Sequence, residues 1–143
     1  MSDAVLNDNS AWSRIQSGSI PDSRASEIAD RLDDGGISVC LPFILEAGVW
    51  ARGLADHDAL FDGFVSFSHL LIDKQAERRA LDAQAQLAAA GHHRLPPVDL
   101  IIAGLADRYE VGVLHYDRDF DLILDKTDLE YDSEWLMPRG SLN

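Results

Sequence analysis

The amino-acid sequence predicts an α/β fold in three layers, with a central, mainly parallel sheet between two layers of helices. Short apolar runs alternate with longer segments in which apolar residues recur at helical spacing. Strand, helix, strand order makes neighbouring strands parallel, and the helical segments are too many to lie on one face of a sheet. Acidic residues follow the apolar runs or open the helices, where open α/β sheets place their functional groups.

Turn residues and helix breakers divide the N-terminal half into elements. The polar residues 7–10 end one apolar run and begin a helix, and residues 33–36, Asp-Asp-Gly-Gly, end another helix. Leu41-Pro42 suits a first helical turn. In chain order we expect a strand at 4–6, a helix carrying residues 11–15, a helix from 21 or 22 to 32, a strand at 37–40, a helix from 41 to about 53 with Phe43 and Trp50 on its apolar face, and a helix at 56–67.

A proline pair organises the C-terminal half. Pro96-Pro97 bars a helix before it and suits a first helical turn, so a helix begins near Val98. Residues 73–90 are rich in Ala, Gln and charge, which favours a long exposed helix. The other expected features are an ambiguous segment at 70–72 that fits a helix end or a short strand, a buried helix face at 98, 101, 102 and 105, a strand at 113–116, a short helix through 124 and an edge strand at 135–137.

The composition is that of one globular domain over residues 1–143, which we expect to be soluble and cytoplasmic. The chain is 46% hydrophobic, enough for a real core. No apolar run approaches the length of a membrane span, and the N-terminus lacks the basic start and apolar centre of a secretory signal. Cys40 is the only cysteine, and its apolar neighbours predict a buried, unreactive thiol.

The formal net charge of −13 argues against a protein that binds nucleic acid through a broad basic face. It is compatible with a nuclease, because divalent cations in an acidic cleft reverse the local sign of the charge. A basic protein partner would also suit an acidic surface.

Four acidic residues share a position at a strand exit or a helix start: Asp8, Glu46, Asp99 and Asp117. One carboxyl edge of a parallel sheet would gather them. Carboxylates so close repel one another, and Mg²⁺ or Mn²⁺ removes that conflict. Such an ion polarises a phosphodiester and lowers the pKa of the attacking water, so the set predicts phosphodiester hydrolysis. Taken singly, each acid also fits a structural role, as a helix cap, a turn residue or an exposed helix acid.

Three short segments also resemble a known family. They are residues 5–11 (VLNDNSA), 97–103 (PVDLIIA) and 115–121 (HYDRDFD). With Glu46 between the first two, and with residues 135–140 (WLMPRG) near the C-terminus, they are similar in order and spacing to the PIN-domain ribonuclease toxins of VapBC toxin–antitoxin pairs, the VapC family. Each motif is short, and the ordered set covers nearly the full chain.

The resemblance implies a PIN-like fold and a Mg²⁺- or Mn²⁺-dependent endoribonuclease that cleaves RNA. It also implies a cognate VapB-like antitoxin that blocks the site, and a homodimer. Ser10 would support the first acid through a hydrogen bond to its carboxylate. Asn7 and His115 depart from the family pattern, which has an apolar residue and a threonine there. The implied metal ligands are Asp8, Glu46, Asp99 and Asp117, with Asp119 a lesser candidate.

Two rival functions come from other classes. A non-catalytic PIN-fold binding module would keep the shape without needing all four acids. A phosphoacceptor receiver domain also binds Mg²⁺ through aspartates, but it needs a lysine after a late strand, and the lysines here are Lys74 and Lys126.

Several other residues invite a functional interpretation. His92-His93 lacks the i, i+4 spacing of a helical metal-binding pair and is expected to be a solvated loop. The aromatic residues Trp12, Phe43 and Trp50 fit a base-stacking platform or, more commonly, a core. The sequence offers five arginines for phosphate contacts without ranking them: Arg14, Arg52, Arg78, Arg79 and Arg118.

Overall fold

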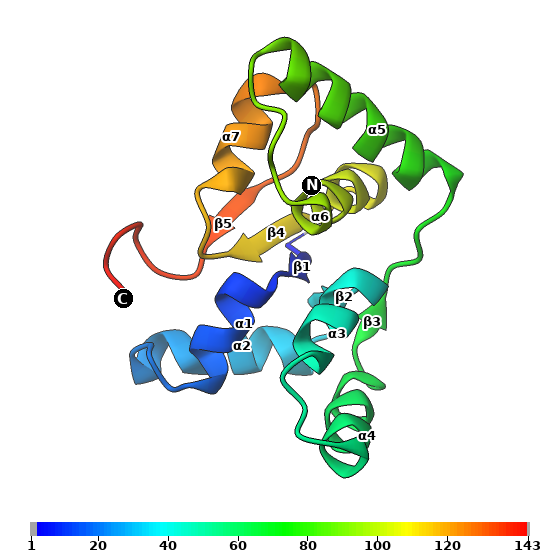
Figure 1. Ribbon diagram of the computed structural model, residues 1–143. Coiled ribbons are helices and arrows are strands. Elements are labelled where there is room, and N and C mark those ends of the chain that lie inside the picture. The colour runs from blue at the N-terminus through cyan, green and yellow to red at the C-terminus, as the bar shows by residue number, and fades with distance from the viewer. Residues whose placement is uncertain (1–2, 143) are drawn as a thin grey trace.

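The computed structural model describes residues 3–142 as a sheet surrounded by helices (Figure 1). Within that range no helix has both the length and the apolar character needed to cross a membrane. The elements are, in order, β1 (Val5–Asn7), α1 (Asn9–Gln16), α2 (Asp22–Asp33), β2 (Ile37–Val39), α3 (Leu41–Gly48), α4 (Leu54–Phe64), β3 (Ser68–His69), α5 (Lys74–Ala89), α6 (Pro97–Tyr109), β4 (Gly112–His115), α7 (Asp119–Lys126) and β5 (Ser133–Trp135).

The sheet confirms the predicted fold class. Its strand order is β3-β2-β1-β4-β5, and all four pairs of neighbours are parallel. β1 lies at the centre, with Val5 opposite Ile37 of β2 on one side and Gly112 of β4 on the other. The carboxyl ends of β1 and β4 therefore lie side by side at one edge of the sheet.

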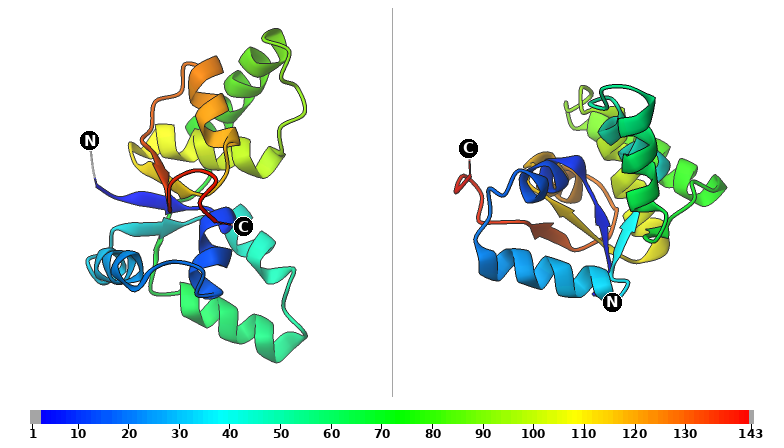
Figure 2. Two further views of the ribbon diagram at one scale, coloured as in Figure 1. Left: turned by 90° about the vertical axis from the view of Figure 1, so that its left-hand side faces the viewer. Right: turned by 90° about the horizontal axis from the view of Figure 1, so that it is seen from below.

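Alternating side chains of the central strands enter two separate cores. Leu6 and Val113 pack with buried residues of α3, α5, α6 and α7, whereas Val5 and Leu114 pack with residues of α1 and α2. Helices therefore cover both faces, as Figure 2 shows. Cys40 is buried in the first core, and burial raises the pKa of its thiol to about 11, as expected for an unreactive cysteine.

Helix α6 carries Asp99 in its first turn and anchors it to the core. Pro97 stands in its first turn, and most of the helix from Asp99 to Ala106 is buried. Gly104 allows a close approach of α5, because a Cβ at this position would lie 3.0 Å from the backbone nitrogen of Ala80. The predicted helix start and buried face are both present.

Several sequence-based expectations are wrong in detail. The helix from Leu41 ends at Gly48 instead of about 53, and the next helix runs from Leu54 to Phe64. Gly53 lies between them with φ 144°, a backbone conformation that interrupts helical continuity. Trp50, placed on an apolar helix face, is 85% exposed. The segment 70–72 forms neither a helix end nor a strand, and the short strand β3 lies just before it at Ser68–His69. The last strand lies at Ser133–Trp135, two residues earlier than expected.

Candidate functional site

The carboxyl edge of the sheet carries the first and last of the predicted acids. Asp8 follows β1 directly and caps helix α1, and its backbone N–H donates to the Leu114 carbonyl of β4 at 3.1 Å. Asp117 follows β4 by two residues. Asp99 lies in the first turn of α6, and Glu46 lies on α3. All four predicted acids thus come from elements that end or begin near this edge.

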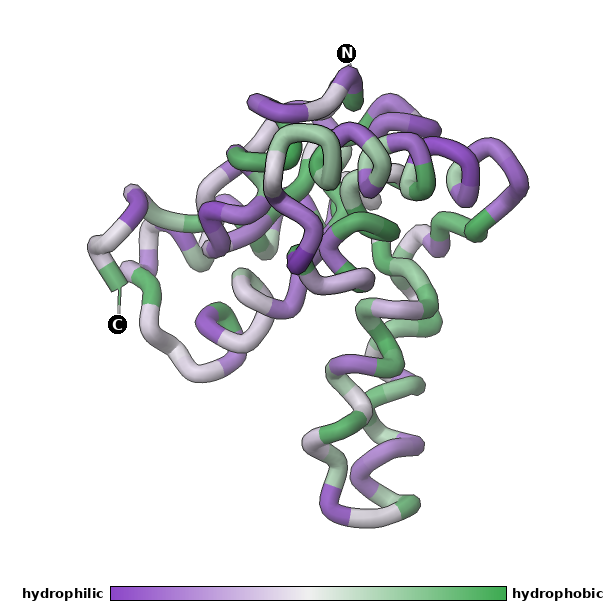
Figure 3. Tube along the Cα trace, turned by 45° about the horizontal axis from the view of Figure 1, so that its top comes forward, coloured by the Kyte–Doolittle hydropathy of each residue, from purple (hydrophilic) through white to green (hydrophobic). Residues whose placement is uncertain are grey.

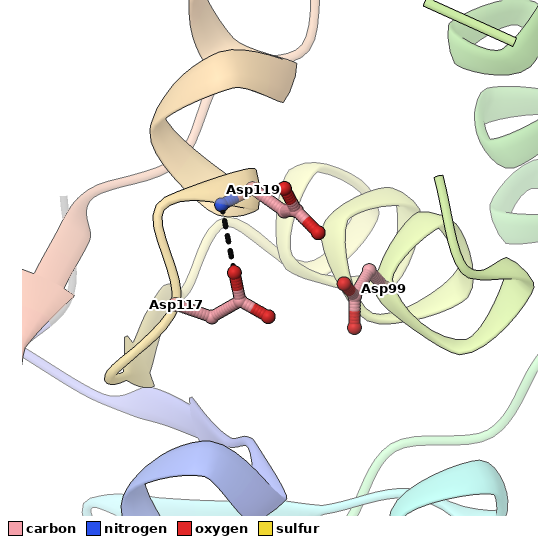
Figure 4. Close-up of side chains that lie close together, drawn as sticks. All are labelled: Asp99, Asp117 and Asp119. Carbon is pink, nitrogen blue, oxygen red and sulfur yellow. Dashed lines mark hydrogen bonds between the residues drawn. The ribbon is translucent and has the colours of Figure 1, made fainter. Parts of the chain in front are cut away.

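The tightest group contains three aspartates. Asp99, Asp117 and Asp119 each offer a carboxylate oxygen, and these oxygens lie within 4.8 Å of one another (Figure 4). The backbone N–H of Asp119 donates to Oδ1 of Asp117 at 2.9 Å, which fixes the turn into α7. Asp119, the lesser candidate from the sequence, therefore belongs to this group, while Asp8 and Glu46 lie outside it.

Asp8 and Glu46 still act on the group through their charge. Burial and the negative charges of Asp8, Asp117, Asp119 and Glu46 together raise the pKa of Asp99 to about 8, with burial the largest cause. Burial likewise raises the pKa of Asp8 to about 6, against the hydrogen bonds from Ser10 that favour its charged form. The five acids form one electrostatically coupled cluster.

The donors around this cluster hold the carboxylates in place. The Ser10 hydroxyl and its backbone N–H both donate to Oδ2 of Asp8, and the hydroxyl accepts from the Tyr116 backbone N–H at 2.8 Å. Asn9 Nδ2 donates to Oε1 of Glu46 at 3.0 Å and to the Phe43 carbonyl at 2.9 Å, which joins α1 to α3. Sequence reasoning missed Asn9, whose position beside the first acid was the available signal.

The cluster fits a hard divalent cation. Oδ2 of Asp99 is buried and has no hydrogen-bond partner among residues 3–142. A buried carboxylate oxygen without a partner is costly, and a cation would satisfy it and relieve the mutual repulsion of the acids. Oxygen ligands from carboxylates are the set that Mg²⁺ and Mn²⁺ prefer.

His115 holds the backbone that carries Asp117. Its ring is fully buried, and its Nδ1 accepts from the Asp117 backbone N–H at 3.1 Å. Nε2 must then carry the ring hydrogen, which it donates to the Ser133 hydroxyl at 2.6 Å. Burial lowers the pKa of His115 to about 4, so the ring is neutral near pH 7.

The far end of this chain of hydrogen bonds is Asp121. Its two carboxylate oxygens accept from the Ser133 hydroxyl and from Nε1 of Trp135, the latter at 2.9 Å. Asp121 and Ser133 have no distinctive signal in the sequence, because they meet His115 only when α7 and β5 pack beside β4.

The three aromatic residues do not form a base-stacking platform, the less favoured of the two alternatives. Phe43 is buried, and the Trp12 ring lies 6.4 Å from the Phe43 ring and 5.8 Å from the Phe64 ring in the core. Trp50 stands apart, exposed in the segment between α3 and α4. The core interpretation therefore holds for Trp12 and Phe43.

A parallel α/β sheet with this acidic cluster at its carboxyl edge defines the class of PIN-domain proteins. Solved structures share the fold: a DNA-bound VapBC from Salmonella typhimurium matches with a TM-score of 0.72 at 17% identity over 96% of this chain and 100% of that chain. VapBC2 from Rickettsia felis, bound to a promoter DNA fragment, matches with a TM-score of 0.71 at 14% identity over 92% of this chain and 98% of that chain.

Sequence comparison gives the family. No model of a known protein family matches the chain. Ribonuclease VapC18 of Mycobacterium tuberculosis is 33% identical over 109 residues, 74% of this chain and 78% of that protein. Ribonuclease VapC51 of the same organism is 33% identical over 99 residues, 69% of this chain and 71% of that protein. The chain belongs to the VapC family of ribonucleases, which confirms the resemblance found in its motifs.

Proposed function

We propose that this chain is the endoribonuclease toxin of a type II toxin–antitoxin pair and that it depends on Mg²⁺ or Mn²⁺. The relatives are named ribonucleases, and the solved neighbours are VapBC complexes. The observation that carries the metal proposal is the position of Asp99. Its carboxylate is buried, one oxygen has no partner among the described residues, and two further carboxylates lie within 4.8 Å.

The residues divide into ligands and supports. We assign metal binding to Asp99, Asp117 and Asp119 as the tight group, with Asp8 and Glu46 completing the site. Ser10 and Asn9 orient Asp8 and Glu46, and His115 holds the Asp117 backbone. When bound, a divalent ion would polarise the phosphodiester and lower the pKa of the attacking water.

Removal of the metal tests this proposal. We expect the purified protein to cleave single-stranded RNA in the presence of Mg²⁺ or Mn²⁺, to stop when EDTA is added, and to resume when either ion is restored in excess. The measurement is the rate of cleavage of a fluorescent RNA. A parallel preparation of Asp117→Asn shows how much cleavage contaminating nucleases contribute. Full activity in EDTA that is absent from the Asp117→Asn preparation would contradict metal dependence.

The rival functions have less support. A receiver domain needs a lysine just after a late strand, yet Lys74 opens α5 and Lys126 ends α7. A non-catalytic PIN-fold module has no need to keep Asp8 and Asp99 buried beside further acids, where their pKa values rise to about 6 and about 8.

We also propose a cognate VapB-like antitoxin as partner, bound by an apolar surface of α3, α4 and the segment between them. Seven large apolar residues in this region have exposed side chains. Figure 3 shows hydrophobic segments between hydrophilic ones along this projecting pair of helices. Several exposed large apolar residues in one region of a protein are typical of interaction sites. The residues are Leu41, Leu45, Val49, Trp50, Leu54, Phe61 and Val65. The homodimer implied by the family also remains a proposal.

Trp50 reports on this partner surface. Because its side chain is 85% exposed, we expect its fluorescence to shift to shorter wavelength when a cognate VapB-like antitoxin is added. Trp50→Phe should lose the shift and keep binding, and Trp50→Asp should weaken binding by about tenfold or more. Isothermal titration measures the affinity. A complex that forms without any shift would place the partner elsewhere.

A further inference from the structure

The structure separates the cationic side chains into two groups. The chain has 12 Lys and Arg against 25 Asp and Glu, so acidic residues far outnumber the cations. Six of the cations pair with a carboxylate within 4 Å, namely Arg24, Arg31, Arg78, Arg79, Arg108 and Lys126. Among residues 3–142 the other six have no such ion pair, and these are Arg14, Arg52, Lys74, Arg94, Arg118 and Arg139.

Three of the unpaired cations gather beside the acidic cluster. A hollow of about 540 Å³ is lined by Arg118 and Arg139 together with His92 and Asp119. A second hollow of about 350 Å³ contains Arg94 and shares His92 with the first. Because Asp119 also belongs to the tight acidic group, the hollows continue outward from the proposed metal site.

The remaining acids of the first hollow leave these arginines available. Both carboxylate oxygens of Asp121 accept hydrogen bonds, from Ser133 and from Trp135. Asp125 pairs with Lys126 at 3.4 Å. Asp119 lies toward Asp99 and Asp117 (Figure 4), and the charge of Arg118 favours the ionised form of Asp119, although the two form no ion pair within 4 Å among the described residues. In an acidic protein, exposed guanidinium groups without a carboxylate partner are suited to an anion that comes from outside.

The arginines left unranked by the sequence can now be separated. Arg78 and Arg79 are paired on α5, where Arg79 donates to Asp107 at 2.8 Å near the C-terminal end of α6. Asp99 is at the opposite end of that helix, eight residues away, or about 12 Å at 1.5 Å per residue. Arg118, by contrast, lies next in sequence to both Asp117 and Asp119.

We propose that Arg118 and Arg139, with His92, bind the phosphate backbone of the RNA on one side of the scissile bond. The inference rests on the proposed ribonuclease function and adds the direction in which the strand leaves the metal site, past Asp119 toward the loop between α5 and α6. Guanidinium groups recognise phosphate oxygens through paired hydrogen bonds, independently of the base. These arginines therefore set affinity for the strand and do not select its sequence.

Binding of a labelled single-stranded RNA tests the inference. All variants are made in an Asp99→Asn protein, so that the RNA stays intact, and fluorescence anisotropy is measured at several salt concentrations. Arg118→Gln/Arg139→Gln should weaken binding by about tenfold or more. The salt dependence should also decrease, because each lost phosphate contact lowers the slope by about 0.7 for a single strand.

Lys74→Gln/Arg78→Gln is the matched control, since it removes the same charge from exposed positions on α5. It should leave affinity and salt slope near those of the parent. Arg118→Lys/Arg139→Lys should recover most of the salt slope. Equal weakening by the two glutamine doubles, or no change in either, overturns the inference, and circular dichroism verifies that each variant is folded.

Failure of this inference and failure of the proposed function are distinguishable. Cleavage by the wild-type protein with Mg²⁺ or Mn²⁺ tests the function alone. If the wild type cleaves RNA and Arg118→Gln/Arg139→Gln binds the labelled RNA as tightly as its Asp99→Asn parent, only the proposed role of the two arginines is wrong. A protein that neither binds nor cleaves any RNA overturns both.

Discussion

Replacing Asp99 by asparagine is expected to abolish RNA cleavage while the protein remains folded. Asn is nearly isosteric, but it removes a negative charge from the centre of the tight acidic group. Loss of a residue that only orients a ligand costs about 10–100-fold, so loss of a ligand should reduce kcat by at least about 100-fold. Asp8→Asn should have a similar effect. Single-turnover cleavage of a fluorescent RNA measures both.

Asp30→Asn is the control for this experiment. Asp30 is exposed on α2, which packs on the opposite face of the sheet from α6, and its replacement makes the same chemical change. It should keep full activity. Undiminished cleavage by purified, folded Asp99→Asn would rule out this site as the centre of the reaction.

The metal-free protein is expected to lose stability as the pH rises from about 4 to 8. The pKa of Asp99 is raised from 3.8 to about 8 and that of Asp8 to about 6. At a pH between 3.8 and these raised pKa values, the folded state keeps carboxyl protons that the unfolded state has lost. Rising pH therefore favours unfolding. The folded state is fully stable with respect to these two groups below about pH 4, where both carboxyl groups are protonated in either state, and its stability falls until the pH has passed the folded-state pKa values. Each such proton contributes a slope of about 1.4 kcal/mol per pH unit.

A divalent cation should reverse this trend. At 100 times its Kd, a ligand adds about 2.7 kcal/mol, or about 5–10 °C in Tm for a chain of this size. Thermal unfolding between pH 5 and 8.5, in EDTA and in Mg²⁺ or Mn²⁺, measures both effects.

Asp99→Asn provides the internal comparison. In EDTA this variant should be more stable than the wild type at pH 8, and the advantage should shrink toward pH 5. Its Tm should respond little to metal. If wild type and variant show the same dependence on pH, the raised pKa of Asp99 is not the cause of the effect.

The sequence by itself determined the fold class and the positions of the acids along the elements. Apolar runs, helical periodicity and the Pro96-Pro97 pair are local signals, and they placed β1, β4 and the start of α6 to within a residue or two. Asp8, Asp99 and Asp117 could be assigned to one edge because parallel strands share their carboxyl ends. The weakest local signals failed at Trp50, where α3 has already ended ahead of the Gly53 turn, and at residues 70–72, which follow the two-residue strand β3 and form neither helix nor strand.

Only the tertiary structure decided how these residues work together. Sequence spacing could not show that Asp119 joins Asp99 and Asp117, that His115 holds the Asp117 backbone through Nδ1, or which arginines lack a carboxylate partner. Each of these facts depends on contacts between elements far apart in the chain, such as α7 and β5 beside β4. Local periodicity reports which face of an element is buried, whereas side-chain pairing depends on packing at the level of ångströms.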